Sequence, residues 1–73
     1  YHKDEKKVHE NLSDREFEIL KLIAQGNSAI LIANNLSISN KTVSTYRSRV
    51  LKKLNLKTNA ALILYAIENN LNE

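Results

Sequence analysis

The sequence predicts an all-α fold, a four-helix bundle with a central helix-turn-helix, and three observations support this prediction. Apolar residues recur at helical spacing in four separate segments. A Ser or Thr stands near the start of each segment, as is typical of helix N-caps. Only a few residues join the second segment to the third, which is the layout of a helix-turn-helix. With 73 residues, the chain is long enough for one domain with one small core.

The first 11 residues are dense in charge and almost free of apolar side chains. Such a segment buries too little apolar surface to fold alone. We therefore expect a linker or flexible arm over residues 1–11 and a folded domain over residues 12–73. The chain begins with Tyr rather than Met, and we interpret it as a piece of a longer protein, although N-terminal processing would leave the same start.

The first predicted helix has a complete start signal. Ser13 is its N-cap, and Glu16, three residues later, completes a capping box. Leu12 and Phe17 stand at the two positions of a hydrophobic staple around this cap. Gly26, the only glycine, supplies the left-handed residue that ends the helix. The apolar face of this helix consists of Phe17, Ile19, Leu20, Ile23 and Ala24.

The second predicted helix is short and covers about residues 28–35. Either Ser28 or Asn27 caps its start. We expect it to stop at Asn34 and Asn35, because Asn tolerates the left-handed conformation that ends helices.

A tight connection over residues 36–38, with Leu36 and Ile38 turned inward, leads to the third predicted helix at residues 40–54. Ser39 caps this helix and Asn55 ends it. Its core-facing side carries Val43, Tyr46, Val50 and Leu54, with Leu51 beside them. Its opposite side carries small polar residues framed by two lysines, namely Lys41, Ser44, Thr45, Ser48 and Lys52. The shoulders between the two sides carry Arg47, Arg49 and Lys53.

The fourth predicted helix runs from Thr58 to about Asn69 and is apolar on every side. A helix that is apolar all round is normally buried all round. One helix on the outside of so small a domain cannot bury that surface against three others. We therefore expect a second copy of the chain to cover its outer face.

The middle of the chain carries charge of one sign. Every acidic residue precedes residue 19 or follows residue 67, whereas seven basic residues lie between these positions and the net charge is +3. A solvated helical protein normally mixes both signs. This distribution indicates an anionic partner, either a nucleic acid or an acidic membrane surface.

The polar side of the third predicted helix fits the major groove of double-stranded DNA. That groove admits one α-helix, provided that the side chains facing the bases are short. The candidate base contacts are Lys41, Ser44, Thr45 and Ser48. The candidate phosphate contacts at the sides of the helix are Arg47, Arg49 and Lys52. We expect Tyr46 to be a ring at the edge of the core with its hydroxyl at the surface, and a phosphate contact is the alternative.

Other classes of function fit the sequence less well. There is no Cys, and His2 and His9 lie in the charged arm without further ligands, so we expect no metal and no cofactor. No apolar run approaches a membrane span and no signal peptide is present, so we expect a cytoplasmic protein. We expect no enzyme, because residues 12–73 hold no His and no converging carboxylate pair. The main alternative is a protein-docking helical module that binds an acidic partner, although the third helix lacks aromatic and Met anchors apart from Tyr46.

Seven segments carry a resemblance to a known family. They are Leu12-Ser13-Asp14-Arg15-Glu16, Ile23-Ala24-Gln25-Gly26-Asn27-Ser28, Ile32-Ala33, Leu36-Ser37-Ile38-Ser39, Lys41-Thr42-Val43, Tyr46-Arg47-Ser48-Arg49 and Lys53-Leu54. In this order and register the chain resembles, over about residues 12–71, the LuxR/NarL/FixJ-type (GerE-like) C-terminal helix-turn-helix DNA-binding domain. Residues 38–46 are especially similar to response regulators of the BvgA/EvgA type.

The resemblance implies the effector domain of a bacterial transcription regulator, without catalysis. We interpret this domain as the last part of the chain of a two-component response regulator. It implies binding to double-stranded promoter DNA as a homodimer, with RNA polymerase as a further partner and a receiver or sensor domain before this one. It maps base contacts onto Lys41, Ser44, Thr45 and Ser48. It maps phosphate contacts onto Arg47, Arg49, Lys52, Lys57 and Thr58. The dimer interface falls on the last helix, at Ile63, Leu64 and Ile67.

Two departures from the family pattern stand out. Many members carry Lys where this chain has Ser44, so the base preference is expected to differ. The second helix has Ala29, Ile30 and Leu31 in place of the usual polar Asn-Lys-Glu, which removes a carboxylate expected to face the first helix. We expect Ile30 and Leu31 to pack locally, although so short a helix cannot place both in the core.

Overall fold

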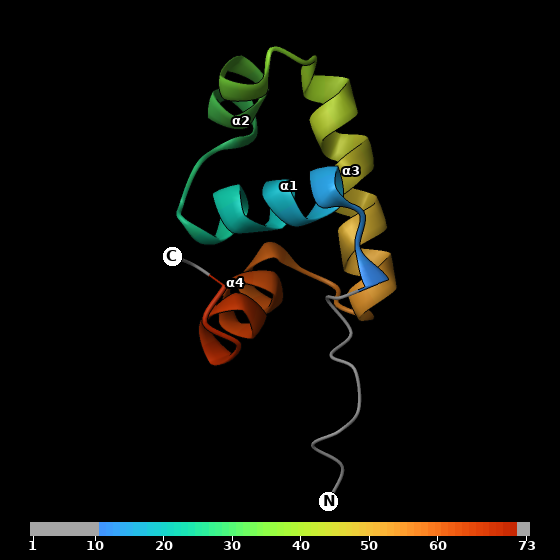
Figure 1. The fold of residues 1–73 in the computed structure, drawn as a ribbon, viewed down its shortest axis with the longest axis vertical. Coiled ribbons are helices and arrows are strands. Elements are labelled where there is room, and N and C mark those ends of the chain that lie inside the picture. Colours follow the sequence, from blue (N-terminus) through green and yellow to red (C-terminus); the bar gives the residue numbers. More distant parts are fainter. Residues whose placement is uncertain (1–10, 72–73) are drawn as a thin grey trace, which may run out of the picture.

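Four helices make up the computed structural model, which describes residues 11–71 (Figure 1). They are α1 (Asp14–Ala24), α2 (Ala29–Leu36), α3 (Asn40–Leu54) and α4 (Asn59–Glu68). The described part of the chain contains no strand, which confirms the predicted all-α fold. Apart from Asn11, the arm predicted for residues 1–11 lies outside the described residues.

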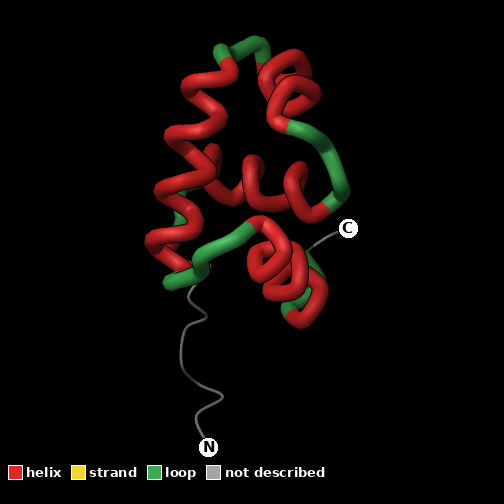
Figure 2. Tube along the Cα trace, turned by 180° about the vertical axis from the view of Figure 1, so that it is seen from behind, coloured by secondary structure: helices red, strands yellow, loops and turns green. Residues whose placement is uncertain are grey.

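The longest helix, α3, runs along one side of the domain, α1 and α2 lie against it, and α4 lies against α1 (Figure 1). The view from behind shows α1 crossing the middle, with α2 and α4 on either side of it (Figure 2). Helix α1 packs on both α3 and α4, while α2 packs mainly on α3. The pair α2 and α3, joined by residues 37–39, is the predicted helix-turn-helix.

All four helices contribute to one hydrophobic core. Its buried members are Ile19, Leu20, Ile23, Ile32, Ala33, Val43, Val50, Leu54, Leu62 and Ala66. Half-buried side chains at its border include Leu36 and Ile38, the two residues predicted to turn inward next to α2. Because the core takes one side of α3, it fixes which side of that helix faces solvent.

The predicted start and end of α1 are confirmed. The Ser13 amide donates to Glu16 Oε1 at 2.9 Å, and the Glu16 amide donates to Ser13 Oγ at 3.1 Å. Together these bonds satisfy two amides that the first turn of a helix leaves without a partner. After α1 the chain turns at Gly26, whose φ of +92° is a backbone conformation that glycine adopts without steric cost.

The predicted end of α2 at Asn34 and Asn35 is wrong. The helix continues to Leu36, and the left-handed residue is Ser37, with a φ of 58°. This conformation brings the Ile38 amide back to donate to the Ala33 carbonyl at 3.0 Å and places the Ile38 side chain against the core. Burial of Ile38 therefore offsets the strain of a left-handed Ser, so the asparagines are not needed to end the helix.

The start of α2 is capped by Ser28, whose Oγ accepts from the Leu31 amide at 3.2 Å, and not by Asn27. Asn27 serves the end of α1 instead, because its side-chain amide donates to the Leu22 carbonyl at 3.0 Å.

The expectation that Ile30 and Leu31 pack locally is wrong. Ile30 is 61% exposed and Leu31 is 51% exposed. Ile32 and Ala33 take the core-facing positions of α2. Ile30 and Leu31 precede Ile32 by two positions and by one, so helical spacing points both side chains away from the core. The polar trio of the family is therefore replaced here by an exposed apolar surface.

Candidate nucleic-acid interface

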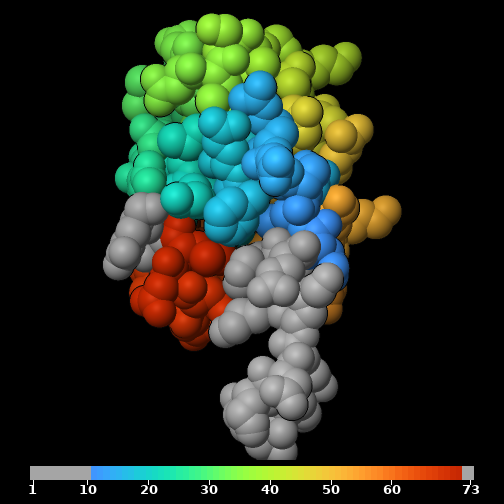
Figure 3. All heavy atoms as spheres, viewed as in Figure 1, coloured from blue at the N-terminus to red at the C-terminus, as the bar shows by residue number. Residues whose placement is uncertain are grey.

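The local sequence fixes both ends of α3 and its rotation about its own axis. Ser39 Oγ accepts from the Thr42 amide at 3.0 Å, which caps the start. Asn55, with a φ of 58°, ends the helix as predicted. Val43, Val50 and Leu54 are buried on one side, so the opposite side must face solvent. Side chains of α3 accordingly project from one edge of the domain (Figure 3).

The four candidate base contacts all lie on the solvent side of α3. Lys41, Ser44, Thr45 and Ser48 are exposed. The hydroxyl of Thr45 donates to the Lys41 carbonyl at 3.1 Å, so its proton is used inside the helix. The Thr45 oxygen still has lone pairs to accept a hydrogen bond. This face therefore offers short side chains that leave the helix backbone accessible, with one cation near its start.

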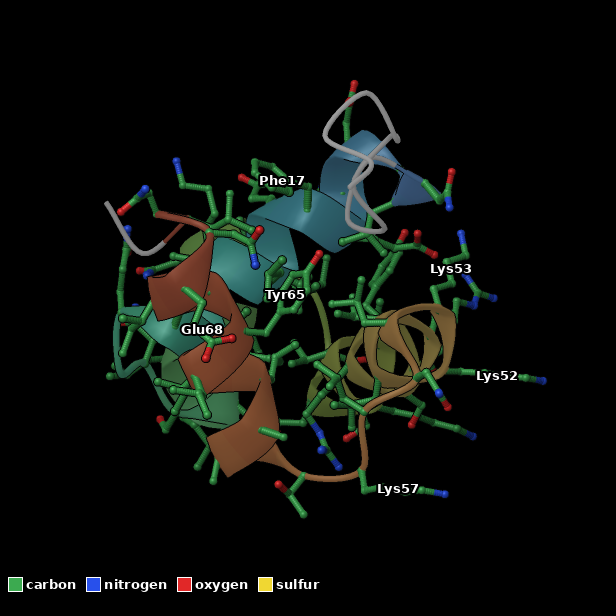
Figure 4. The ribbon with its side chains drawn as sticks, turned by 90° about the horizontal axis from the view of Figure 1, so that it is seen from below. Phe17, Lys52, Lys53, Lys57, Tyr65 and Glu68 are labelled. Atoms are coloured by element: carbon green, nitrogen blue, oxygen red, sulfur yellow. The ribbon has the colours of Figure 1, made fainter. Side chains whose placement is uncertain are left out.

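The candidate phosphate contacts lie at the edges of this face and beyond it. The guanidinium of Arg49 lies 5.7 Å from the centre of the Tyr46 ring, a cation–π contact that restricts where the charge can lie. Tyr46 is half-buried at the edge of the core, as predicted. Lys52 and Lys57 are exposed, and both project away from the body of the domain on the same side (Figure 4). Thr58 Oγ1 caps α4 by accepting from the Ala61 amide at 3.0 Å.

Arg47 lies elsewhere. It is half-buried, and its Nη1 donates to Asn59 Oδ1 at 3.0 Å, at the start of α4. The sequence placed Arg47 on a shoulder of α3 and did not single out Asn59. Arg47 follows Val43 by four residues and precedes Val50 by three, so helical spacing already puts it next to the core-facing side.

Lys53 was also assigned to a shoulder, and it too has a partner within the domain. Its Nζ lies 2.8 Å from Glu16 Oε1 and joins α3 to α1. Glu16 is only 4% exposed. The hydrogen bond from Lys53, then that from the Ser13 amide, hold the pKa of the Glu16 carboxyl below its ordinary value of 4.5, against the opposing effect of burial.

A known protein family has a sequence pattern that matches this chain. Residues 10–66 match the sequence pattern of the bacterial regulatory proteins of the luxR family, the GerE domain. The chain belongs to this family. It is therefore a luxR-family helix-turn-helix domain of the kind found in transcription regulators.

Individual relatives agree with this assignment of the luxR-family domain. This chain is 46% identical over 68 residues to a protein described as a transcriptional regulator of Pseudomonas aeruginosa, and the match covers 93% of this chain and 33% of the relative. It is 52% identical over 60 residues to the transcription regulator BvgA of Bordetella pertussis, covering 82% and 29%. It is 41% identical over 69 residues to the response regulator VraR of Staphylococcus saprophyticus, covering 94% and 33%. The chain thus spans about a third of the length of these curated relatives.

The charges of this luxR-family domain are separated in space as well as in sequence. Within residues 11–71, the acidic side chains belong to α1 and α4, and α2 and α3 carry none. The acidic residues of this part are Asp14, Glu16, Glu18 and Glu68. Glu16 is neutralised by Lys53, and Glu18 pairs with Arg15 at 3.2 Å. The solvent side of α3 is therefore positive without a competing carboxylate on the same helix.

In residues 11–71 no group of three or more His, Cys, Asp or Glu side chains comes together as a metal site would require. None of the helices described there has the length and apolar character needed to cross a bilayer.

Proposed function

We propose that this domain binds double-stranded DNA with sequence preference, by placing α3 in the major groove. The observation that carries the proposal is the division of α3 into two sides. One side is buried in the core. The other is exposed, short, hydroxyl-bearing and basic, on a helix without acidic residues. Family membership supports the same function, and we propose no catalytic role.

We propose that bases are contacted by Lys41, Ser44, Thr45 and Ser48. The short hydroxyl side chains let the helix backbone come close to the base edges, where they donate or accept hydrogen bonds. Lys41, near the start of α3, reaches guanine O6 and N7, the commonest acceptors for a cation in this groove. Because Thr45 already donates to the Lys41 carbonyl, we propose that it meets the bases as an acceptor and through its methyl group.

We propose that phosphates are contacted by Arg49 and Lys52 on α3 and by Lys57 and Thr58 in the connection to α4. These side chains are exposed and flank the base-contacting face. The three cations among these side chains would each neutralise about one phosphate per domain. The logarithm of the binding constant should then fall with the logarithm of salt concentration with a slope of about −3, at about −0.9 per phosphate.

We propose that the domain binds DNA as a dimer through α4. Ala60, Leu64 and Ile67 are exposed and follow one another at positions i, i+4 and i+7, so they form one apolar stripe on the outer side of the helix. Leu64 is 56% exposed and Ile67 is 52% exposed. Ile63, the third residue predicted for this interface, is half-buried against the core.

For the whole protein, we propose a cytoplasmic response regulator in which a receiver or sensor domain controls this effector domain and RNA polymerase is a further partner. The support is the length of the relatives, about three times that of this chain, and the description of VraR as a response regulator.

Titration of a fluorescently labelled duplex of random sequence, at several salt concentrations, tests the proposal. We expect binding with the steep salt dependence given above. Unlabelled polyglutamate serves as the competitor that separates DNA binding from docking of an acidic partner. Binding that polyglutamate displaces as readily as duplex DNA would contradict the proposal and favour the docking module.

A further inference from the structure

The contact between Arg47 and Asn59 connects two helices that otherwise touch little. Helix α4 packs mainly against α1, not against α3. Among the hydrogen bonds between described residues, the one from Arg47 Nη1 to Asn59 Oδ1, at 3.0 Å, joins a side chain of α3 to a side chain of α4. Besides the packing of both helices on α1, this contact and the connection between the helices tie the start of α4 directly to α3.

That connection, residues 55–58, is held at both of its ends. At the first end, the Leu56 amide donates to the Leu51 carbonyl at 2.8 Å, and the Leu56 side chain packs against the core. At the second end, Asn59 is held by Arg47. Lys57 lies between these two fixed points, with its side chain projecting into solvent (Figure 4). The backbone that carries Lys57 is thus tied to α3 on both sides.

Arg49 and Lys52 are well placed to contact DNA, but Arg47 is not. On a helix with 100° per residue, Arg47 lies near Val43 and Leu54 of the core-facing side, and roughly opposite Thr45 and Lys52. It is half-buried, and part of its guanidinium is already hydrogen-bonded to Asn59. Its charge nevertheless remains on the domain whether or not Asn59 is present, so the two residues can be tested separately.

We propose that Arg47 is a positioning residue. By its hydrogen bond to Asn59 it holds the connection between α3 and α4 in place, so that Lys57 and Thr58 contact a phosphate on the DNA strand beside α3. This inference rests on the proposed function. It assigns Arg47 an indirect role, in place of the direct phosphate contact that the family resemblance implies, and it adds Asn59 to the residues on which DNA affinity depends.

The test uses a neutral residue to change an electrostatic quantity. Asn59→Ala removes no charge, yet it should lower the magnitude of the salt slope by about 0.9, because the Lys57 contact with its phosphate is lost. The corresponding loss of affinity is about eightfold at a salt concentration of about 0.1 M. Lys57→Ala should give the same change, and the double variant should lose no more than either single variant. An exposed neutral amide directly after α1, Gln25, provides the control, and Gln25→Ala should leave the salt slope and the affinity unchanged.

The outcomes separate this inference from the proposed function. Thermal unfolding of each variant first establishes that it folds, and Asn59→Ala is expected to melt within a few degrees of the parent chain. If Lys52→Ala and Arg47→Ala lower the salt slope but Asn59→Ala does not, Arg47 contacts DNA directly and this inference is overturned while the proposed function stands. If the parent chain shows no salt-dependent binding to a duplex, both are overturned. Equal, non-additive losses for Asn59→Ala and Lys57→Ala are the result we expect.

Discussion

Replacing Lys53 by Met removes the ammonium group from the pair with Glu16 and keeps a side chain of similar length. The Glu16 carboxylate, whose side chain is 5% exposed, then keeps the bond from the Ser13 amide at 2.9 Å but loses its charged partner at 2.8 Å. Breaking a fully buried ion pair costs about 3–5 kcal/mol. The Lys53 side chain is 42% exposed, so solvent screens the pair and the cost is reduced. We expect Lys53→Met to lower the free energy of unfolding by about 1–2 kcal/mol at neutral pH.

The same substitution should make the loss depend on pH. Lys53 is the first cause that lowers the pKa of Glu16 below 4.5 in the folded domain. A carboxyl whose folded pKa is depressed stabilises the fold above its unfolded pKa, and this stabilisation is lost as the pH falls through the folded pKa. Without Lys53 the folded pKa rises, so less of this stabilisation exists to be lost. The difference in the free energy of unfolding between the parent chain and Lys53→Met should therefore be largest at pH 7 and should narrow as the pH falls below 4.5.

Urea unfolding followed by circular dichroism, at neutral and acidic pH, measures both effects. The neighbouring Lys52 provides the matched control, because it is exposed and projects away from the domain (Figure 4). Lys52→Met removes the same charge and should change the free energy of unfolding by less than about 0.5 kcal/mol. Equal losses for the two variants, or a Lys53→Met loss that is the same at both pH values, would refute the assignment of Lys53 as the partner of Glu16.

Three further substitutions test the turn, the cap and the outer surface. Gly26→Ala should lower the free energy of unfolding by about 1–2 kcal/mol, purely from its positive φ, because no atom lies within 4 Å of the added Cβ; an unchanged stability would show that another residue can adopt this turn. Ser39→Ala should cost about 1 kcal/mol through loss of the α3 cap, and a neutral result in the same unfolding assay would contradict the capping role. Ile67→Asp should leave the stability of the monomer within about 0.5 kcal/mol of the parent chain but weaken binding to a duplex with two half-sites more than to one with a single half-site; equal losses on both duplexes would exclude α4 as the dimer contact.

Much of the fold was predictable because its signals are local. The bounds of α3 agree with the prediction because Ser39 and Asn55 mark its two ends within a few residues. The prediction for the end of α2 was wrong because that end depends on burial of Ile38. Whether Ile38 is buried can be known only once the position of the core is known. Periodicity identified the exposed side of α3, and single residues at its ends identified the caps. Both signals lie within one or two turns of the helix.

The contacts that tie α3 to its neighbours were not predictable in this way. Glu16 and Lys53 are 37 positions apart in the sequence, and Arg47 and Asn59 are 12 apart. No local pattern indicates which Lys or Arg on a helix meets a partner from another helix, because that depends on how the helices cross. The sequence therefore did not show that Arg47 and Lys53, both assigned to the shoulders of α3, have partners within the domain.

The proposed function assigns base contacts to the exposed face of α3 and phosphate contacts to its flanks. It is tested most directly by comparing the affinities of Lys41→Ala, Thr45→Ala and Arg49→Ala for two duplexes, one selected by the parent domain from a random library and one of random sequence. We expect the first two substitutions to weaken binding to the selected duplex by about 1–3 kcal/mol for a lost base contact, with a smaller loss on the random one. Arg49→Ala should weaken binding to both duplexes alike. Equal losses on both duplexes for all three variants would contradict this assignment.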